Sequence, residues 1–158
     1  YVSAIIAASL HSIPIENSIN ALKNFEGVKR RLEFKGAFKN IKIYDDFAHH
    51  PTAIAYTSNA IRTKYKNKKI LALIELGSNT MSSGYHGNSI IDQTRKLDNT
   101  LWLDYKNVLS NNKKTYNNDK DFIESVKKIV FDYDIILLMT NKNRQKLLTP
   151  LIKYIEKE

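Results

Sequence analysis

The stretch KILALIE, residues 69–75, is a continuous apolar run that ends at a carboxylate. A run of this length is typical of a strand buried on both faces, as in a parallel sheet covered by helices. A second run of the same kind, DIILLMT at residues 134–140, occurs near the end of the chain. Two such strands in one chain indicate an α/β domain with a parallel sheet at its centre.

Strand-like and helical segments alternate around these two runs. Residues 51–65 follow a helical pattern that begins at a proline and places Ile54, Ser58 and Ile61 on one face. The alternation predicts a Rossmann-like open, mostly parallel sheet flanked by helices. The other predicted strands are residues 32–38, 41–44 and 100–105, and the other predicted helices are about 89–97, 119–133 and 144–157, the last broken or bent near Pro150.

The first 25 residues predict two helices that precede this alternating pattern. Residues 1–12 are typical of the end of a helix whose beginning is missing, because no capping residue precedes their apolar positions. Pro14 suits the first turn of a second helix, and we expect Gly27 to end it. Since the chain starts at Tyr1 rather than Met, we expect it to be a fragment of a longer protein.

The composition indicates a globular domain in the cytoplasm. A chain of 158 residues suits one domain with a real core, and the lack of cysteine excludes disulfides and thiolate metal sites. No apolar run approaches the ~18 residues of a membrane helix, and no signal-peptide pattern opens the chain. We therefore expect a cytoplasmic protein without a membrane partner.

The formal net charge of +9 raises the question of a nucleic-acid partner, because basic residues neutralise phosphates. Twenty of the 25 basic residues are lysines scattered along the chain, and the densest cluster is KYKNKK at residues 64–69. This scatter indicates the codon bias of an AT-rich genome more than a binding patch. We therefore expect no nucleic-acid partner.

The stretch YDDFAHHP, residues 44–51, places two carboxylates and two imidazoles where a predicted strand ends. One interpretation is structural, with Asp46 or His50 capping the following helix. A metal site is a second, but His49 and His50 are adjacent and diverge, so we predict no metal here. In a third, Asp46 accepts hydrogen bonds from a ribose and His49 donates one to a phosphate.

Two further stretches complete the candidate site. In GVKRRLE, residues 27–33, Arg31 directly precedes a predicted strand, which favours a bidentate contact with phosphate. ELGSNTMSSGYHG, residues 75–87, exceeds the ~12 residues beyond which loops in compact domains usually have a function. Its neutral donors and acceptors suit a peptide or carboxylate, and they are Ser78, Asn79 and Thr80.

The positions of these stretches in the predicted fold place them together. Ligands of open α/β sheets bind beyond the carboxyl ends of the strands. Residues 45–46 and 75–81 each follow a predicted strand, so we expect them at one edge of the sheet.

Taken together and in this order, GVKRRLE, YDDFAHHPTAI and SNTM resemble the C-terminal domain of the Mur ligase family. The resemblance is dense over residues 24–86 and weaker beyond. SNTM is similar to the branch that recycles a murein tripeptide, whereas DD-x-x-HHP is shared with the branch that adds L-alanine. The resemblance implies that residues 1–25 are the terminal helices of a central ATP-binding domain and that residues 26–158 form the amine-substrate-binding domain.

The resemblance also implies a reaction. It implies an ATP-dependent ligase of peptidoglycan recycling that joins L-alanyl-γ-D-glutamyl-meso-diaminopimelate to UDP-N-acetylmuramate through an acyl phosphate. ATP and Mg²⁺ would be bound mainly by the central domain, and the N-terminal and central domains of the same chain would be its partners. The alternatives are a UDP-N-acetylmuramate–L-alanine ligase and a non-catalytic α/β nucleotide-binding module.

Site roles follow from the resemblance position by position. Arg31 matches an arginine that reaches the ATP phosphates, Asp46 an aspartate at the ribose, and His49 a residue of the same cleft. His50 would shape the substrate side of the loop, and no residue has a certain catalytic role. The tripeptide would be read by Ser78, Asn79 and Thr80.

The sequence departs from the family pattern in two loops and lacks one motif. Leu76 and Gly77 stand where relatives carry Pro-Arg, and TNKNRQKLL at residues 140–148 lacks the glycines of the family's loop. The 158 residues contain five glycines and no G-x-x-G-K-T/S phosphate loop. We therefore expect this chain by itself to be catalytically silent.

Overall fold

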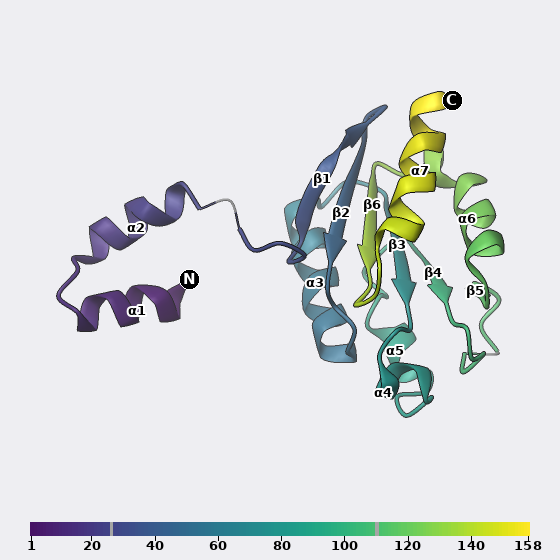
Figure 1. Ribbon diagram of the computed structural model, residues 1–158, viewed down its shortest axis with the longest axis horizontal. Helices are drawn as coiled ribbons and strands as arrows, with labels where there is room; N and C mark the ends of the chain where they lie inside the picture. The colour runs from purple at the N-terminus through teal and green to yellow at the C-terminus, as the bar shows by residue number, and fades with distance from the viewer. Residues whose placement is uncertain (26, 110) are drawn as a thin grey trace.

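The computed structural model describes residues 1–25, 27–109 and 111–158. Within these residues a six-stranded sheet has the order β1-β2-β6-β3-β4-β5, with β1 antiparallel to β2 and the other neighbours parallel (Figure 1). This confirms the predicted open, mostly parallel α/β sheet. The strands are β1 (Glu33–Phe38), β2 (Ile41–Asp46), β3 (Ile70–Glu75), β4 (Asn99–Leu103), β5 (Thr115–Tyr116) and β6 (Ile135–Met139).

Helices cover both faces of the sheet. One face carries α3 (Pro51–Lys64) with the short helices α4 (Asn79–Ser82) and α5 (Ser89–Asp92). The other carries α6 (Asp119–Lys127), the 3₁₀ helix η1 (Val130–Asp132) and α7 (Gln145–Lys157) (Figure 1). The predicted buried face of α3 is confirmed, because its buried residues are Ile54, Ser58 and Ile61.

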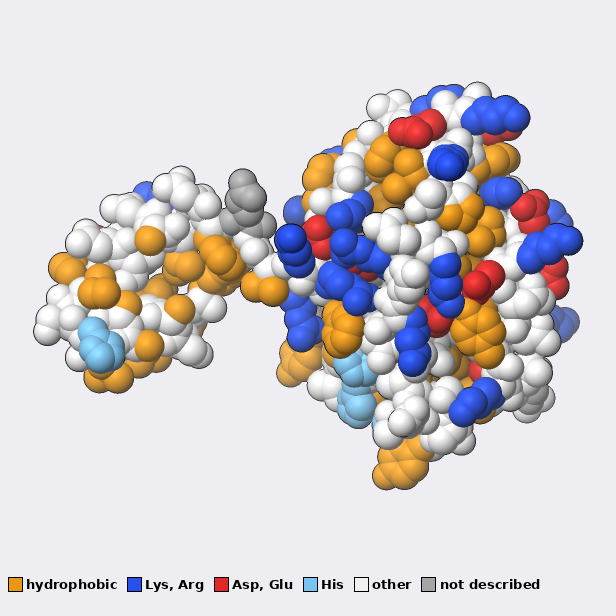
Figure 2. All heavy atoms as spheres, viewed as in Figure 1, with side chains coloured by type: hydrophobic (Ala, Val, Ile, Leu, Met, Phe, Trp, Pro, Cys, Tyr) orange, Lys and Arg blue, Asp and Glu red, His pale blue; other side chains and the backbone are white. Residues whose placement is uncertain are grey.

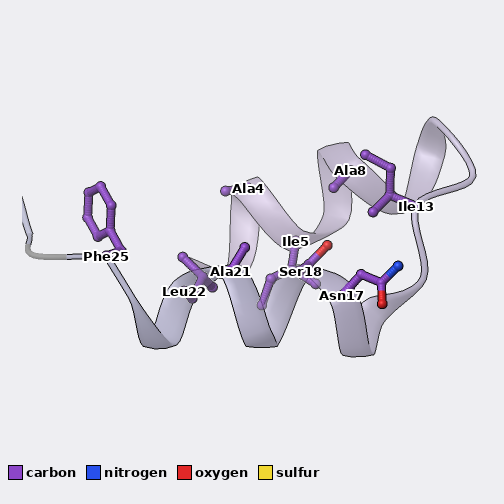
Figure 3. A pocket seen from close by; sticks show the side chains of 9 residues that line it. All are labelled: Ala4, Ile5, Ala8, Ile13, Asn17, Ser18, Ala21, Leu22 and Phe25. Atoms are coloured by element: carbon purple, nitrogen blue, oxygen red, sulfur yellow. The ribbon is translucent and has the colours of Figure 1, made fainter.

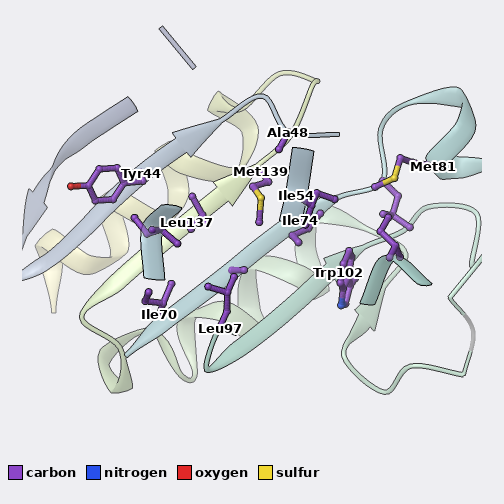
Figure 4. Close-up of a cluster of buried hydrophobic side chains, with 14 of the residues drawn as sticks. Tyr44, Ala48, Ile54, Ile70, Ile74, Met81, Leu97, Trp102, Leu137 and Met139 are labelled. Atoms are coloured by element: carbon purple, nitrogen blue, oxygen red, sulfur yellow. The ribbon is translucent and has the colours of Figure 1, made fainter. Parts of the chain in front are cut away.

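The two buried runs of the sequence form β3 and β6 at the centre of the sheet, and their side chains pack into the cores on both faces. Side chains alternate across a strand, so one strand supplies two cores. Ile70, Ala72 and Ile74 of β3 pack in the α3 layer, part of which Figure 4 shows. Leu71 and Leu73 pack in the α6–α7 layer. β3 and β6 are buried along their whole lengths, as the apolar runs predicted.

Several predicted boundaries were wrong. The predicted loop at residues 76–87 contains α4, because Ser78 caps a helical turn there. The helices predicted at 89–97 and 119–133 are shorter: the first is α5 followed by turns, and the second is α6 followed by η1. α7 continues unbroken past Pro150, held by the buried side chains of Leu147, Leu148, Leu151 and Ile155.

The first 25 residues form a helical hairpin that stands apart from the sheet in Figure 1. Its helices are α1 (Val2–Leu10) and α2 (Ile15–Lys23), and neither buries a residue. α2 ends at Lys23 rather than at the predicted Gly27, and the amide of its C-cap residue, Asn24, bonds to the Ala21 carbonyl. An apolar groove of about 370 Å³ runs between the helices (Figure 3). Among the described residues, no helix is long and apolar enough to cross a membrane.

Candidate functional site

The carboxyl ends of the three central strands lie side by side. In the strand register Asp46 of β2 is opposite Met139 of β6, and Met139 is also opposite Ile74 of β3. The segments that follow these strands therefore meet at one edge, as the sequence predicted for residues 45–46 and 75–81. We call this edge the carboxyl edge.

Asp46 is a buried organiser of this edge. One carboxylate oxygen accepts from the Leu32 amide at 2.7 Å, and the other accepts from the Ala48 amide at 2.8 Å and the Thr57 hydroxyl at 3.2 Å. The side chain is 4% exposed. Two charge-assisted bonds to backbone amides fix the loop after β2 and the turn before β1. The oxygen that faces Leu32 keeps capacity for a further hydrogen bond.

The turn before β1 presents Arg31. β1 starts at Glu33, so Arg31 lies in this turn and not beside a strand residue as predicted. Its neighbours Arg30 and Leu32 both have left-handed backbone, with φ of 59° and 48°. This conformation costs roughly 1–2 kcal/mol for a residue other than glycine, and such strain gathers at functional sites. The Asp46 bond to the Leu32 amide offsets it on one side.

Arg31 is exposed beside a cavity of about 470 Å³. Lys29 and Lys64 line the same cavity. Figure 2 shows Lys and Arg side chains gathered here, over the start of β1. The acid that lines it, Glu33, accepts from Lys35 and from the Arg30 amide, which with Lys35 holds the pKa of Glu33 at about 2. The cavity therefore favours an anionic ligand.

Asp45 points to the opposite face of the sheet from Asp46. It is fully buried, and Arg144 at the start of α7 donates to it. The Nε atom of Arg30 lies 3.6 Å from the same carboxylate oxygen. Arg144 also bonds to Glu33 at 3.1 Å. Asp45 thus fixes α7 against β1 and β2, and the adjacent aspartates serve different layers.

The two histidines diverge, as the sequence predicted. His49 bonds through Nδ1 to the Phe47 carbonyl at 2.8 Å, and its ring packs on the edge of Phe47. His50 caps α3 by accepting from the Thr52 amide at 3.4 Å, which confirms the capping interpretation for this residue. Within the described residues no group of three or more acidic or histidine side chains is placed to hold a metal ion.

The segment Ser78 to Thr80 forms the start of α4 next to the histidine loop. The Ser78 hydroxyl donates to the His49 carbonyl at 3.2 Å and accepts from the Met81 amide at 3.3 Å. Asn79 and Thr80 are exposed. Asn79 lines a cavity of about 220 Å³ between the ends of β3 and β4. The structure therefore joins the predicted nucleotide and amine segments directly at Ser78.

A polar cluster around the buried Glu75, which we did not predict from the sequence, lies under this second cavity. Glu75 is 1% exposed, accepts from the Thr140 hydroxyl at 2.5 Å and pairs with Lys146 at 2.8 Å. Burial by itself lowers the pKa of Lys146, but the hydrogen bonds to Glu75 and Tyr105 outweigh burial and raise the pKa. Burial and a bond from its hydroxyl to Asp119 raise the pKa of Tyr105 to about 12. We call Glu75, Tyr105, Asp119, Thr140 and Lys146 the Glu75 cluster.

Gly77 lies where the loop after β3 meets the loop after β6. A Cβ atom at this position would lie 2.5 Å from Oδ1 of Asn141 and 2.7 Å from Cγ of Lys142. The missing side chain at residue 77 therefore makes room for residues 141 and 142. Residue 77 and the loop after β6 are therefore neighbours in space, a contact that we did not predict from the sequence.

The fold and the carboxyl edge define a class of protein: an open α/β domain whose loops present cations and hydrogen-bonding groups beyond its parallel strands. The family model described as "Mur ligase, glutamate ligase domain" matches residues 30–142, which is most of the chain. The chain therefore belongs to this family, and the resemblance identified in the sequence is confirmed.

One curated relative is a ligase of the recycled tripeptide. Over 101 residues the chain is 44% identical to the UDP-N-acetylmuramate–L-alanyl-gamma-D-glutamyl-meso-2,6-diaminoheptandioate ligase of Haemophilus influenzae. The alignment covers 63% of this chain and 22% of that protein. The chain thus spans about a fifth of the length of this relative.

Two solved structures are similar over longer stretches. The murein peptide ligase of Psychrobacter arcticus has a TM-score of 0.74 and 29% identity, over 98% of this chain and 36% of that one. A domain of a putative ligase of the same tripeptide from Haemophilus ducreyi has a TM-score of 0.65 and 27% identity, over 79% of this chain and 99% of that one. The similarity to the first structure extends into the helical hairpin.

Proposed function

We propose that this chain is the amine-substrate domain of an ATP-dependent ligase that joins L-alanyl-γ-D-glutamyl-meso-diaminopimelate to UDP-N-acetylmuramate in peptidoglycan recycling. One observation carries the proposal beyond family membership. The turn that presents Arg31 and the segment Ser78–Thr80 lie at the same edge of the sheet, linked through Asp46 and the histidine loop. A phosphate contact and an amine contact are thus available at one site.

On the nucleotide side, Arg31 is the residue that contacts the ATP phosphates. A guanidinium forms paired hydrogen bonds with phosphate oxygens and keeps its charge at any physiological pH. Lys29 and Lys64 add positive charge to the same cavity. Asp46 orders the turn and offers its remaining acceptor capacity to a ribose hydroxyl, and the exposed part of His49 faces the same ligand.

On the amine side, Ser78, Asn79 and Thr80 read the incoming peptide, and His50 shapes the loop next to them. The cavity beside Asn79 is lined by Lys106 and Lys142 and lies over the Glu75 cluster. The peptide amine attacks an acyl phosphate formed on the lactyl carboxylate of UDP-N-acetylmuramate, and phosphate leaves. Excluding water from that intermediate is the task of the closed domains.

Other parts of the full-length protein complete this scheme. We propose that residues 1–25 are the last helices of a central ATP-binding domain and that residues 26–158 are the amine-substrate domain. ATP fits the cationic cavity at Arg31 through its phosphates. We assign the phosphate loop and the main Mg²⁺ site to the central domain, as the family resemblance implies.

The test uses Arg31→Ala in the full-length protein. The control is Arg95→Ala, because Arg95 is also an exposed arginine and pairs only with Asp92 of α5 among the ion pairs of the described residues. Loss of a charged bond to a developing phosphate lowers the rate of acyl-phosphate formation about 10²–10³-fold, and the control keeps the wild-type rate. Trapping the acyl phosphate with hydroxylamine measures this step. Wild-type acyl-phosphate formation by Arg31→Ala would overturn the assignment.

The amine substrate is tested separately with purified full-length wild-type protein. We expect amide formation with the tripeptide and not with L-alanine, whereas the reverse preference would make the protein an alanine-adding ligase. ATP binding without amide formation from either amine would favour a non-catalytic nucleotide-binding module. We expect no turnover from the 158-residue chain assayed by itself.

A further inference from the structure

The side chain of Arg30 crosses the carboxyl edge from the nucleotide side to the amine side. Its Nη2 atom donates to the carbonyl oxygens of Thr140 and of Lys142, the latter at 3.3 Å. Its guanidinium also lies over the Phe47 ring, 4.7 Å from the centroid. Arg30 itself belongs to the turn that presents Arg31. One partly buried side chain therefore connects this turn to the loop after β6.

The backbone of Arg30 is fixed as firmly as its side chain. Its carbonyl accepts from the Phe47 amide at 2.8 Å, and its amide donates to Glu33 at 2.9 Å. These bonds hold Arg30 in its left-handed conformation, with φ of 59°. A shift of its guanidinium would therefore move the turn and, with it, Arg31.

The loop that Arg30 holds is part of the amine side. The Lys142 amide donates to the Thr140 hydroxyl at 2.9 Å, and that hydroxyl donates to Glu75. Lys142 lines the cavity beside Asn79, and its side chain occupies the space next to Gly77. A continuous set of contacts thus runs from Arg30 through residues 140–142 to the cavity.

The ion pair with Asp45 does not by itself account for the position of Arg30. Its Nε atom lies 3.6 Å from Asp45, which is within ion-pair range but too long for a hydrogen bond, and this atom has no hydrogen-bond partner among the described residues. Arg144 already donates directly to Asp45. The guanidinium of Arg30 instead bonds to two backbone carbonyls, the arrangement of a group that fixes a loop.

We propose that Arg30 is a positioning residue that couples the phosphate-binding turn to the amine-side loop at residues 140–142, so that the two sides of the site are aligned together. This inference rests on the proposed function for what the two sides bind. It predicts that a change at Arg30 disturbs both half-sites, although its side chain contacts neither ligand. A change at Arg31 disturbs the phosphate side only.

The experiment compares Arg30→Met with Arg62→Met in the full-length protein. Arg62 is a matched control, because it is also partly buried and also donates to backbone carbonyls, those of Lys68 and Lys96. It lies at the opposite edge of the sheet, where it bonds to Asp98. Loss of a hydrogen bond from a charged group changes an equilibrium or rate constant about 10–100-fold. Arg30→Met should therefore raise the peptide KM and slow acyl-phosphate formation by that factor.

Three outcomes distinguish coupling from a purely structural role. Arg62→Met should change neither the peptide KM nor acyl-phosphate formation, and Arg31→Ala should change only the second. Arg30→Lys should not restore either, because an ammonium lacks the planar guanidinium group that lies over the Phe47 ring while it donates to residues 140 and 142. An effect of Arg30→Met on only one half-site, or equal effects of Arg62→Met, would overturn the proposal.

A second measurement does not depend on catalysis. Hydrogen–deuterium exchange of the full-length protein should be faster at both residues 28–32 and 140–143 in Arg30→Met, and unchanged there in Arg62→Met. Faster exchange at only one of the two segments contradicts the coupling even if the enzyme proves inactive. Absence of tripeptide ligation by the wild type would instead count against the proposed function.

Discussion

The two sides of the carboxyl edge are built from different kinds of contact. On the nucleotide side, Asp46 accepts from two backbone amides and a hydroxyl that lie at residues 32, 48 and 57. On the amine side, Glu75 meets the hydroxyl of Thr140 and the ammonium of Lys146. Both carboxylates are buried, but the first is held by nearby backbone and the second by side chains from the far end of the chain.

This difference affects how each side of the carboxyl edge responds to mutation. A carboxylate held by backbone amides keeps most of its environment when a side chain is mutated. An ion pair with a buried carboxylate depends on both partners, because removing the cation leaves the carboxylate uncompensated. The amine side is therefore the more fragile of the two.

The largest effect is expected for Lys146→Met. This change leaves Glu75 buried without its cation, and we expect the free energy of unfolding to fall by about 3–5 kcal/mol. Urea denaturation of the full-length protein followed by tryptophan fluorescence measures this loss, since the chain's Trp102 is buried in the sheet. Lys153→Met, at an exposed position of the same helix, is the control. Equal stability of the two variants would contradict the fragility of the amine side.

A smaller loss is expected for Asp46→Asn. The amide side chain keeps the shape but presents an NH₂ group to a backbone amide, so we expect a loss of about 2–3 kcal/mol in the free energy of unfolding. The same denaturation experiment measures it, with the exposed Asp92→Asn as the control. A loss larger than that of Lys146→Met would reverse the comparison between the two sides.

Gly77→Ala tests how tightly the two loops of the amine side pack against each other. The added methyl group overlaps Asn141 and Lys142, and we expect a cost of about 1–2 kcal/mol. Because Lys142→Ala removes the Cγ atom that the methyl group meets, the double variant should recover part of this loss. Thermal unfolding measures all three variants. Additive losses would show that the two loops do not compete for this space.

The smallest effect is the acid dependence from Glu33. Its pKa of about 2 lies below the ordinary value of 4.5, so this carboxylate stabilises the fold above pH 4.5. The contribution is lost as the pH falls through 2, and for a partly exposed group it amounts to about 1 kcal/mol. Glu33→Gln should flatten the stability profile between these pH values in acid titrations followed by circular dichroism. An unchanged slope would remove Glu33 from the set of stabilising carboxylates.

Several features of the fold could be predicted from local patterns. The apolar runs that became β3 and β6 and the helical spacing of Ile54, Ser58 and Ile61 were correct, because burial on both faces or on one stripe leaves a short-range signal. The short strand β5 was missed, since two residues carry too little pattern. α4 was missed because its cap, Ser78, lies in a segment with no apolar periodicity.

The candidate site was predictable to a similar extent. The placement of Asp46, His49 and Ser78 at one edge was correct, whereas the binding roles of the seven proposed site residues stay predictions. The roles of Asp45, Glu75, Lys146 and Arg30 were not predicted, because each depends on a partner distant in sequence. A buried Glu at the end of an apolar run was a signal that the sequence did contain.

The sequence by itself determined the layered α/β architecture, the edge of the sheet that carries the candidate site, and the family. These follow from periodicity and motifs, which depend on residues close together in the chain. Only the tertiary structure decided which aspartate organises which layer, how Gly77 admits the loop at residues 141–142, and that Arg30 links the two half-sites. The physical reason is that hydrogen bonds and ion pairs between distant residues depend on side-chain geometry, which no local pattern encodes.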